Sequence, residues 1–417
     1  MRRGLANTLL VAVAVILSLG AVEAALLVLA GFTQADNRGN VFRYEDLYVS
    51  NRPIATFDPV SGYRRTPGST RIVRITHDIL IFDQTFTPNN AGYISARDYT
   101  HEKPAGTARI VVLGDSFTTE EFNPQPWPDR VDAALKGRTT RPTELYSFAV
   151  NGAGLGNWST IFFDDIVPHY QFDALVIATY VDNLARQYSY LHYDGPNAYI
   201  GFFPTRAATT EDFLANYLPR MAPHNVKVAT DAEIDAMIAS LRQPWQWPGF
   251  ELRSGPLIAA QWQRFRSGRM RAIPAVAGPA TAPGGDTGGD IAAIAAQYGP
   301  AQFGLLQQIM GYCRDHGIPV ILASVPGRDT VRAFAESKGR DETPHQRETR
   351  ALAAHFGALY MDGYAPFGQV LPADIDERYW LKFDGHWNQA GSNLFADAMT
   401  DFLIANQDKL VRAQTKP

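Results

Sequence analysis

The chain has 417 residues, of which 46% are hydrophobic and 19% charged, and this length predicts a core domain with an addition or insertion. A net charge of -4, with no basic stripe of interleaved aromatic residues, excludes a general attraction to nucleic acid. The single cysteine, Cys313, excludes an internal disulfide, and without a Cys/His cluster it argues against a structural zinc site.

The amino terminus carries a candidate membrane segment. Residues 8–31 are apolar except for Glu23 and follow two arginines; at about 1.5 Å per residue they would extend roughly 36 Å, enough to cross a bilayer. The positive end should stay in the cytoplasm, so we expect a single-pass protein of a bacterial inner membrane with a periplasmic body. A cleavable signal peptide is the alternative, because residues 9–19 form a fair apolar h-region. Glu23 would be protonated, would snorkel, or would contact a partner membrane helix.

The next region, residues 33–104, contains no long helical period, and we call it the apron. Thr70–Thr76 and Ile79–Phe86 alternate apolar and polar residues around His77-Asp78, which predicts a β-hairpin. The apron should therefore be a small β-rich region between the membrane and the core.

The core itself alternates short apolar runs with helical patterns. The runs predict five buried strands at Ile110–Leu113, Leu145–Val150, Ala174–Thr179, Pro319–Ser324 and Leu359–Met361. The helical patterns cover 128–135, 158–170, 291–316, 343–356 and 390–406. Because strands separated by helices need crossover connections, we expect an α/β fold, a three-layer α/β/α sandwich around a mainly parallel five-stranded sheet.

About a hundred residues interrupt the core between its third and fourth strands. Glu211–Leu218 and Asp231–Leu241 have helical spacing, whereas 243–250 concentrates aromatic residues and 275–289 is rich in Ala, Pro and Gly. We expect a helical cap over the carboxyl edge of the sheet, followed by a flexible tether. The expected organisation is an anchor (1–32), the apron (33–104), the first part of the core (105–200), the cap insertion with its linker (201–290) and the second part of the core (291–417).

The chemistry-bearing residues lie at two ends of this core. Ser116 follows the first strand in Gly114-Asp-Ser-Phe117, so it should reach the carboxyl edge, where ligands of open α/β sheets bind. His386 is the candidate base, and Asp384, two residues earlier on the same loop, is the candidate for the carboxylate that orients it. The backbone N–H of Ser116 is one candidate donor to an oxyanion. The sequence contains no phosphate-binding loop, dinucleotide fingerprint, metal cluster or cofactor lysine, so we expect no cofactor and no metal.

Gly114-Asp-Ser-Phe117 and Asp384-Gly-His-Trp-Asn388 resemble the first and last sequence blocks of the SGNH/GDSL hydrolases, over about residues 105–200 and 300–405. The resemblance implies the SGNH-hydrolase (flavodoxin-like) fold and a serine ester hydrolase or O-acyltransferase. It also implies that Gly152, in Asn151-Gly-Ala-Gly154, donates a second backbone N–H to the oxyanion. The third block departs from the family pattern, because Asp182 occupies the position of the usual asparagine. We therefore expect Asn183, one residue later, to supply the side-chain donor.

Three functions remain open from the sequence. The first is a membrane-anchored periplasmic serine esterase that removes an acyl group, with acetyl favoured, from a carbohydrate or another envelope molecule. The second is an O-acyltransferase that acts on an envelope polysaccharide, with a multispan membrane partner protein to deliver the acyl group. The third is a non-catalytic envelope scaffold or binding protein, which the exchange at Asp182-Asn183 favours.

Overall fold

The computed structural model describes residues 13–21, 44, 46–181, 183–195, 197–241 and 289–410. Most of the predicted membrane segment, Asp182, the aromatic segment and nearly all of the predicted tether lie outside these ranges. Residues 13–21 are helical, and no helix within the described part of the chain is long and apolar enough to cross a membrane. The membrane anchor therefore stays a prediction.

The chain divides into two compact units. The smaller unit comprises Met1–Leu47, Ile75–Leu80 and Asp235–Val276, and in it the N–H of Tyr44 donates to Oδ1 of Asp78 over 2.8 Å. The larger unit comprises Tyr48–Arg74, Ile81–Ile234 and Ala277–Pro417. All the described candidate site residues lie in the larger unit.

A five-stranded parallel sheet forms the centre of the larger unit. Its strands are β6 (Ala108–Leu113), β7 (Thr143–Ser147), β8 (Ala174–Thr179), β12 (Val320–Ser324) and β13 (Leu359–Asp362). They are arranged in the order β13-β12-β8-β6-β7, and the register pairs Val111 with both Tyr146 and Leu175. Every residue of β6, β8 and β12 is buried, as expected for strands covered on both faces. The predicted sheet is confirmed.

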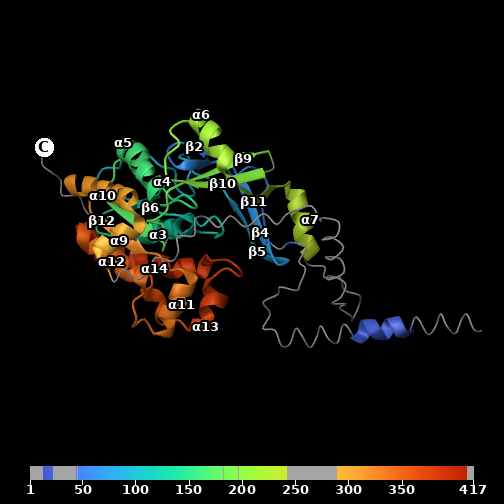
Figure 1. Cartoon of the computed structure of the whole chain (residues 1–417). Helices are drawn as coiled ribbons and strands as arrows, with labels where there is room; N and C mark the ends of the chain where they lie inside the picture. The colour runs from blue at the N-terminus through green and yellow to red at the C-terminus, as the bar shows by residue number, and fades with distance from the viewer. Residues whose placement is uncertain are drawn as a thin grey trace, which may run out of the picture. The chain divides into compact units, whose positions relative to one another are not determined.

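Helices cover both faces of this sheet (Figure 1). The main ones are α2 (Ser116–Thr119), α3 (Trp127–Leu135), α4 (Leu155–Thr160), α5 (Val167–His169), α9 (Ile291–Tyr298), α10 (Pro300–Asp315), α11 (Arg328–Glu336), α12 (Pro344–Phe356) and α14 (Gln389–Ala405). Parallel crossovers are right-handed, so connections that run in opposite directions across the sheet lie on opposite faces. Accordingly α4, α9, α10 and α12 pack together, whereas α3 packs against α14.

One predicted helix is divided in two. The pattern over 291–316 predicts a continuous helix, but α9 ends at Tyr298 and α10 begins at Pro300. Gly299 between them has φ of 83°, a left-handed conformation that glycine adopts without steric cost, and proline lacks the N–H that a continuous helix would need.

The apron contributes to a second sheet. This sheet has six strands in the order β5-β4-β1-β11-β10-β9. Its strands are β1 (Asp46–Ser50), β4 (Thr70–Thr76), β5 (Ile79–Phe86), β9 (Tyr188–Asp194), β10 (Asn197–Phe203) and β11 (Ala222–Val228). The predicted hairpin is confirmed as β4 and β5, with His77 and Asp78 at φ of 51° and 57° in the turn. The smaller pair β2 (Ala55–Asp58) and β3 (Gly62–Arg65) is antiparallel.

The insertion differs from the predicted helical cap. Its two predicted helices are present, as α6 (Thr210–Asp212) continued by 213–217 and as α7 (Asp231–Leu241). However, β9, β10 and β11 join the strands of the apron, and the boundary expected at residue 200 falls inside β10. β1 pairs in parallel with β11, placing Tyr48 opposite Val226. A strand at the edge of the apron presents unpaired N–H and C=O groups, and the strands of the insertion pair with them.

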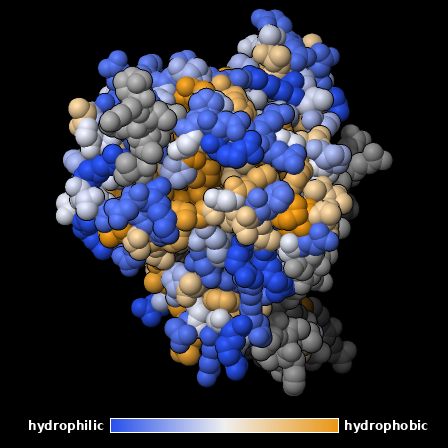
Figure 2. Space-filling view, turned by 90° about the vertical axis from the view of Figure 1, so that its left-hand side faces the viewer, coloured by the Kyte–Doolittle hydropathy of each residue, from blue (hydrophilic) through white to orange (hydrophobic). Residues whose placement is uncertain are grey.

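Large apolar side chains are exposed at a few described positions. Figure 2 shows one face of the molecule, on which hydrophilic residues predominate and apolar ones gather toward the middle. Some exposed apolar residues are ordinary on a protein surface. Of the exposed large apolar residues, Phe383 is 40% exposed and directly precedes Asp384.

Candidate active site

Strand β6 brings Ser116 to the carboxyl edge of the five-stranded sheet. The turn after the strand requires glycine at position 114, because a Cβ there would lie 2.2 Å from Oγ1 of Thr118. Asp115 then caps α2, since its Oδ1 accepts the N–H of Phe117 over 2.9 Å. Ser116 therefore begins a short helix at the edge where the sequence predicted it.

Ser116, His386 and Asp384 form a continuous hydrogen-bonded series. The Ser116 hydroxyl lies 2.7 Å from Nε2 of His386, and Nδ1 of His386 lies 2.6 Å from Oδ1 of Asp384. The same Oδ1 accepts the backbone N–H of His386 over 2.8 Å. With Nδ1 protonated toward Asp384, Nε2 is left as an acceptor for the serine proton, which is the arrangement of a nucleophile, a base and an orienting group.

Asp384 is held in its ionised form. Burial raises its pKa, but the hydrogen bond from His386 and the charges of His386 and Arg74 outweigh burial and lower the pKa to about 2. Arg74, on β4 of the apron, forms an ion pair with Oδ2 of Asp384. Nothing in the sequence around Arg74 indicated this contact.

The loop that carries Asp384 and His386 is closed by its own hydrogen bonds. The N–H of Leu381 donates to the carbonyl of His386 over 2.9 Å, and the indole of Trp380 donates to the carbonyl of Gly385 over 2.8 Å. After the loop, Oδ1 of Asn388 accepts the N–H of Ala390 over 2.9 Å and caps α14. These contacts fix where the imidazole enters the site.

The ring of His386 is also confined by aromatic neighbours. The ring centroids of Phe117 and Phe122 lie 4.7 Å and 4.9 Å from its own. Phe117 comes from α2 and Phe122 from the segment after it, so the nucleophile region itself packs against the base. This packing restricts rotation of the imidazole away from Ser116.

Glu120 connects the two halves of the site through a buried carboxylate. It is fully buried, its Oε1 accepts the indole N–H of Trp387, and its Oε2 accepts the N–H of Trp127 over 2.8 Å and the hydroxyl of Ser392 over 2.7 Å. Burial raises its pKa to about 8, against the opposing effect of these hydrogen bonds. One carboxylate thus joins the end of α2 to α3, to α14 and to the residue that follows His386.

We expect Glu120→Gln to destabilise the protein by about 1–3 kcal/mol, because the amide NH₂ must face at least one buried donor. The raised pKa makes the stability that Glu120 contributes greatest below about pH 4.5 and smaller as the pH rises toward 8. Urea unfolding at about pH 5 and about pH 8 measures both effects. The exposed Glu377→Gln is the control; equal stability of the two variants would contradict the assigned role.

The turn after β7 places Gly152 in a left-handed backbone conformation, and the donation of its N–H to an oxyanion stays a prediction. Gly152 has φ of 73°, and a Cβ built on it would have Oγ of Ser189 as its only neighbour, at 3.9 Å. Gly154 is needed for packing, since a Cβ there would lie 2.5 Å from the carbonyl oxygen of Asn183. Position 152 therefore favours glycine because of its left-handed backbone conformation, whereas position 154 requires glycine because another segment of backbone approaches it closely.

Asn183 is placed differently from the expectation that its side chain donates to an oxyanion. Its Nδ2 donates to Oδ2 of Asp115 over 2.9 Å and to the carbonyl of Ala153 over 3.2 Å, so both amide protons are used, and the residue is fully buried. Its Oδ1 accepts the N–H of Tyr180 over 2.5 Å. In this structure Asn183 joins the nucleophile turn to the Gly152 turn rather than pointing a donor at substrate. Asp182 lies outside the described residues.

The apron contacts all three segments that form the site. The Tyr63 hydroxyl donates to the carbonyl of Asn151 over 3.0 Å, beside Gly152. Arg65 forms a buried ion pair with Glu121, which follows the nucleophile helix. With the ion pair between Arg74 and Asp384, these contacts make the apron a support for the site rather than only a spacer.

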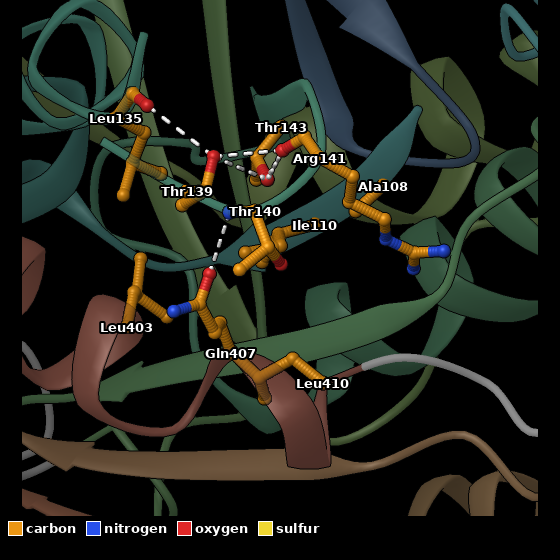
Figure 3. Close-up of a pocket in the computed structure, with 10 residues that line it drawn as sticks. All are labelled: Ala108, Ile110, Leu135, Thr139, Thr140, Arg141, Thr143, Leu403, Gln407 and Leu410. Carbon is orange, nitrogen blue, oxygen red and sulfur yellow. Dashed lines mark hydrogen bonds between the residues drawn. The ribbon is translucent and has the colours of Figure 1, made fainter. Parts of the chain in front are cut away.

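The small pocket in Figure 3 is separate from this site. It has a volume of about 20 Å³, room for about one water molecule. Ala108 and Thr143, which line it, are the first residues of β6 and β7, so it lies at the end of the sheet opposite Ser116. Within the described ranges, no group of three or more His, Cys, Asp or Glu side chains is placed to hold a metal ion.

A serine, a histidine and an aspartate stand in hydrogen-bonded series at the carboxyl edge of a parallel sheet between helical layers, the arrangement that an activated serine nucleophile requires. Ser116 comes from the loop after the first core strand, and Asp384 and His386 come from one loop before the last helix, which are the positions that the resemblance to the SGNH/GDSL hydrolases implies. The predicted α/β fold around a parallel five-stranded sheet is confirmed.

No protein-family model matches the chain, and no curated protein matches it by sequence. Among solved structures, it is similar to a catalytic mutant of Axe2, an acetylxylan esterase from Geobacillus stearothermophilus, with 10% identity, a TM-score of 0.37 and coverage of 74% of this chain and 97% of that one. It is also similar to a lipase/acylhydrolase from Enterococcus faecalis, with 13% identity, a TM-score of 0.31 and coverage of 72% and 96%. A GDSL-like lipase from Bacteroides thetaiotaomicron has 12% identity, a TM-score of 0.29 and coverage of 72% and 88%.

Proposed function

We propose that the protein is a membrane-anchored periplasmic serine esterase that removes an acyl group from a carbohydrate or another envelope molecule. Acetyl is the acyl group that we favour. The observation that carries the proposal is the pair of short contacts, 2.7 Å from Ser116 to His386 and 2.6 Å from His386 to Asp384. The location rests on the apolar segment 8–31 and the arginines before it.

In this mechanism Oγ of Ser116 attacks the ester carbonyl while Nε2 of His386 takes its proton. Asp384 keeps Nδ1 protonated and stabilises the imidazolium that forms. The N–H groups of Ser116 and Gly152 donate to the oxyanion. Collapse of the tetrahedral intermediate releases the alcohol, which takes the proton from His386, and water then hydrolyses the acyl-enzyme by the same steps.

Two substrates offered to the full-length protein test this proposal, a short-chain aryl ester and an acetylated polysaccharide. Release of the aryl alcohol and of free acetate, both lost in His386→Ala, would support the esterase. Acetyl transfer to a polysaccharide hydroxyl without net release of acetate would replace it by the O-acyltransferase. Equal residual rates of ester hydrolysis in wild type and His386→Ala would favour the third function, a non-catalytic envelope scaffold or binding protein.

A further inference from the structure

The two oxygens of the Asp384 carboxylate have separate partners. Oδ1 accepts from Nδ1 and from the backbone N–H of His386, over 2.6 Å and 2.8 Å, whereas Oδ2 is paired with the guanidinium of Arg74. The Asp384 side chain is 5% exposed and that of Arg74 is 22% exposed. Both oxygens of this buried carboxylate are therefore engaged, one by His386 and the other by Arg74.

Arg74 reaches this carboxylate from a distant part of the sequence. It lies on β4 of the apron, 310 residues before Asp384, and both residues belong to the larger unit. A guanidinium presents several N–H donors in one plane, so it can hold an oxygen in a fixed direction as well as compensate its charge. The contact therefore constrains the one side chain that orients the base.

We propose that Arg74 is a positioning residue that fixes the rotamer of Asp384 and compensates part of its charge, so that Nδ1 of His386 stays directed at Oδ1 of Asp384. The inference deepens the proposed function and rests on it. A positive charge opposite the carboxylate weakens its stabilisation of the imidazolium, so removing that charge should favour the protonated form of the ring.

Other charged groups near this pair are already engaged. Arg328 of α11 donates from Nη1 to the backbone carbonyl of Asp384 over 3.2 Å, and its Nε is paired with Asp376 at 2.5 Å. Arg332 is paired with the same Asp376. Glu120 faces the loop only through the indole of Trp387. None of these three groups is paired with the Asp384 carboxylate. The guanidinium of Arg74 is paired with Oδ2, the oxygen that does not accept from His386.

The variants Arg74→Gln and Arg74→Lys test the proposal in the full-length protein, with Arg71→Gln as the matched control. Arg71 lies on the same strand and pairs with Asp83 at 2.7 Å, so its loss removes a cation and an ion pair of β4 without touching Asp384. We expect kcat/KM for the aryl ester to fall about ten- to a hundredfold in Arg74→Gln, because misplacement of an orienting group costs rate on that scale. The acid limb of the pH profile should move to higher pH. The kcat/KM of Arg74→Lys should fall between those of wild type and Arg74→Gln. The kcat/KM of Arg71→Gln should match that of wild type.

A measurement independent of turnover separates this inference from the proposed function. The downfield proton resonance of the His386 ring, identified by its absence in His386→Ala, should titrate at higher pH in Arg74→Gln than in wild type, whether or not the ester is hydrolysed. Guanidinium ions at millimolar concentration should restore activity to Arg74→Ala, while urea should not. Unchanged titration and kcat/KM in Arg74→Gln, or equal losses in Arg74→Gln and Arg71→Gln, would overturn the inference.

Discussion

Ser116→Ala is expected to lower turnover of an aryl ester by about 10⁵- to 10⁶-fold, to the rate that binding and the backbone donors alone provide. The reason is that Oγ is the only atom at the 2.7 Å position opposite Nε2 of His386, so no other described group can replace the nucleophile there. The change removes one oxygen from a helix that Asp115 still caps, and the fold should persist.

The measurement is kcat/KM together with labelling by a serine-directed phosphonate, mapped by mass spectrometry. Wild type should be labelled at Ser116, and the alanine variant should not be labelled. Ser337→Ala is a suitable control, because this serine lies at the end of α11 and its hydroxyl bonds the carbonyl of Phe334. Labelling that persists in Ser116→Ala, or turnover within tenfold of wild type, would refute the assignment of the nucleophile.

Asp384→Asn should lower kcat/KM by about ten-thousandfold while leaving the shape of the site nearly unchanged. The amide can present NH₂ to His386, which would favour the tautomer protonated on Nε2, and that nitrogen could then no longer accept the serine proton. Arg74 would also face a neutral group, so some stability should be lost. The comparison with Asp397→Asn, an exposed carboxylate on α14 paired with Arg130, controls for the loss of one charge.

The lowered pKa of Asp384 in wild type predicts how the stabilities of wild type and Asp384→Asn differ in their pH dependence. Because the folded-state pKa of Asp384 is about 2, below that of an unfolded chain, its contribution to stability is present above about pH 4 and is lost as the pH falls toward 2. Wild type should therefore lose stability more steeply than Asp384→Asn between about pH 4 and pH 2, as acid denaturation followed by circular dichroism would show. Parallel curves for the two proteins would contradict the ion pairing.

The core strands were predictable because each is a continuous run of apolar residues bounded by charge or glycine. Residues 110–113 and 174–179 lie within or match β6 and β8 for this reason. The strands of the insertion carried a local signal as well, since Asp194-Gly195 follows an alternating segment and Gly195 has φ of 58° in the hairpin. What no local pattern states is that this hairpin joins a sheet begun by the apron, because strand pairing is a property of the folded chain.

The residues of the candidate site also fall into those that the sequence could predict and those that it could not. The contact of Ser116 and Asp384 with His386 was predictable because motif and position in the fold agree. Arg74 and Glu120 were not, since an arginine on an alternating strand and a glutamate after a short helix are usually solvated, and only the packed structure shows their partners. Asn183 shows the converse: its residue type fits an oxyanion donor, but its two amide protons are already committed.

The parallel pairing of β1 with β11 has a consequence for how the protein is made. β1 leaves the ribosome early, yet Tyr48 acquires its neighbour Val226 only after 178 further residues have been synthesised. A nascent chain stopped before that point would present an open strand edge, which favours association with other chains. His386 emerges later still, so the hydrolytic apparatus stays incomplete until translation is nearly finished.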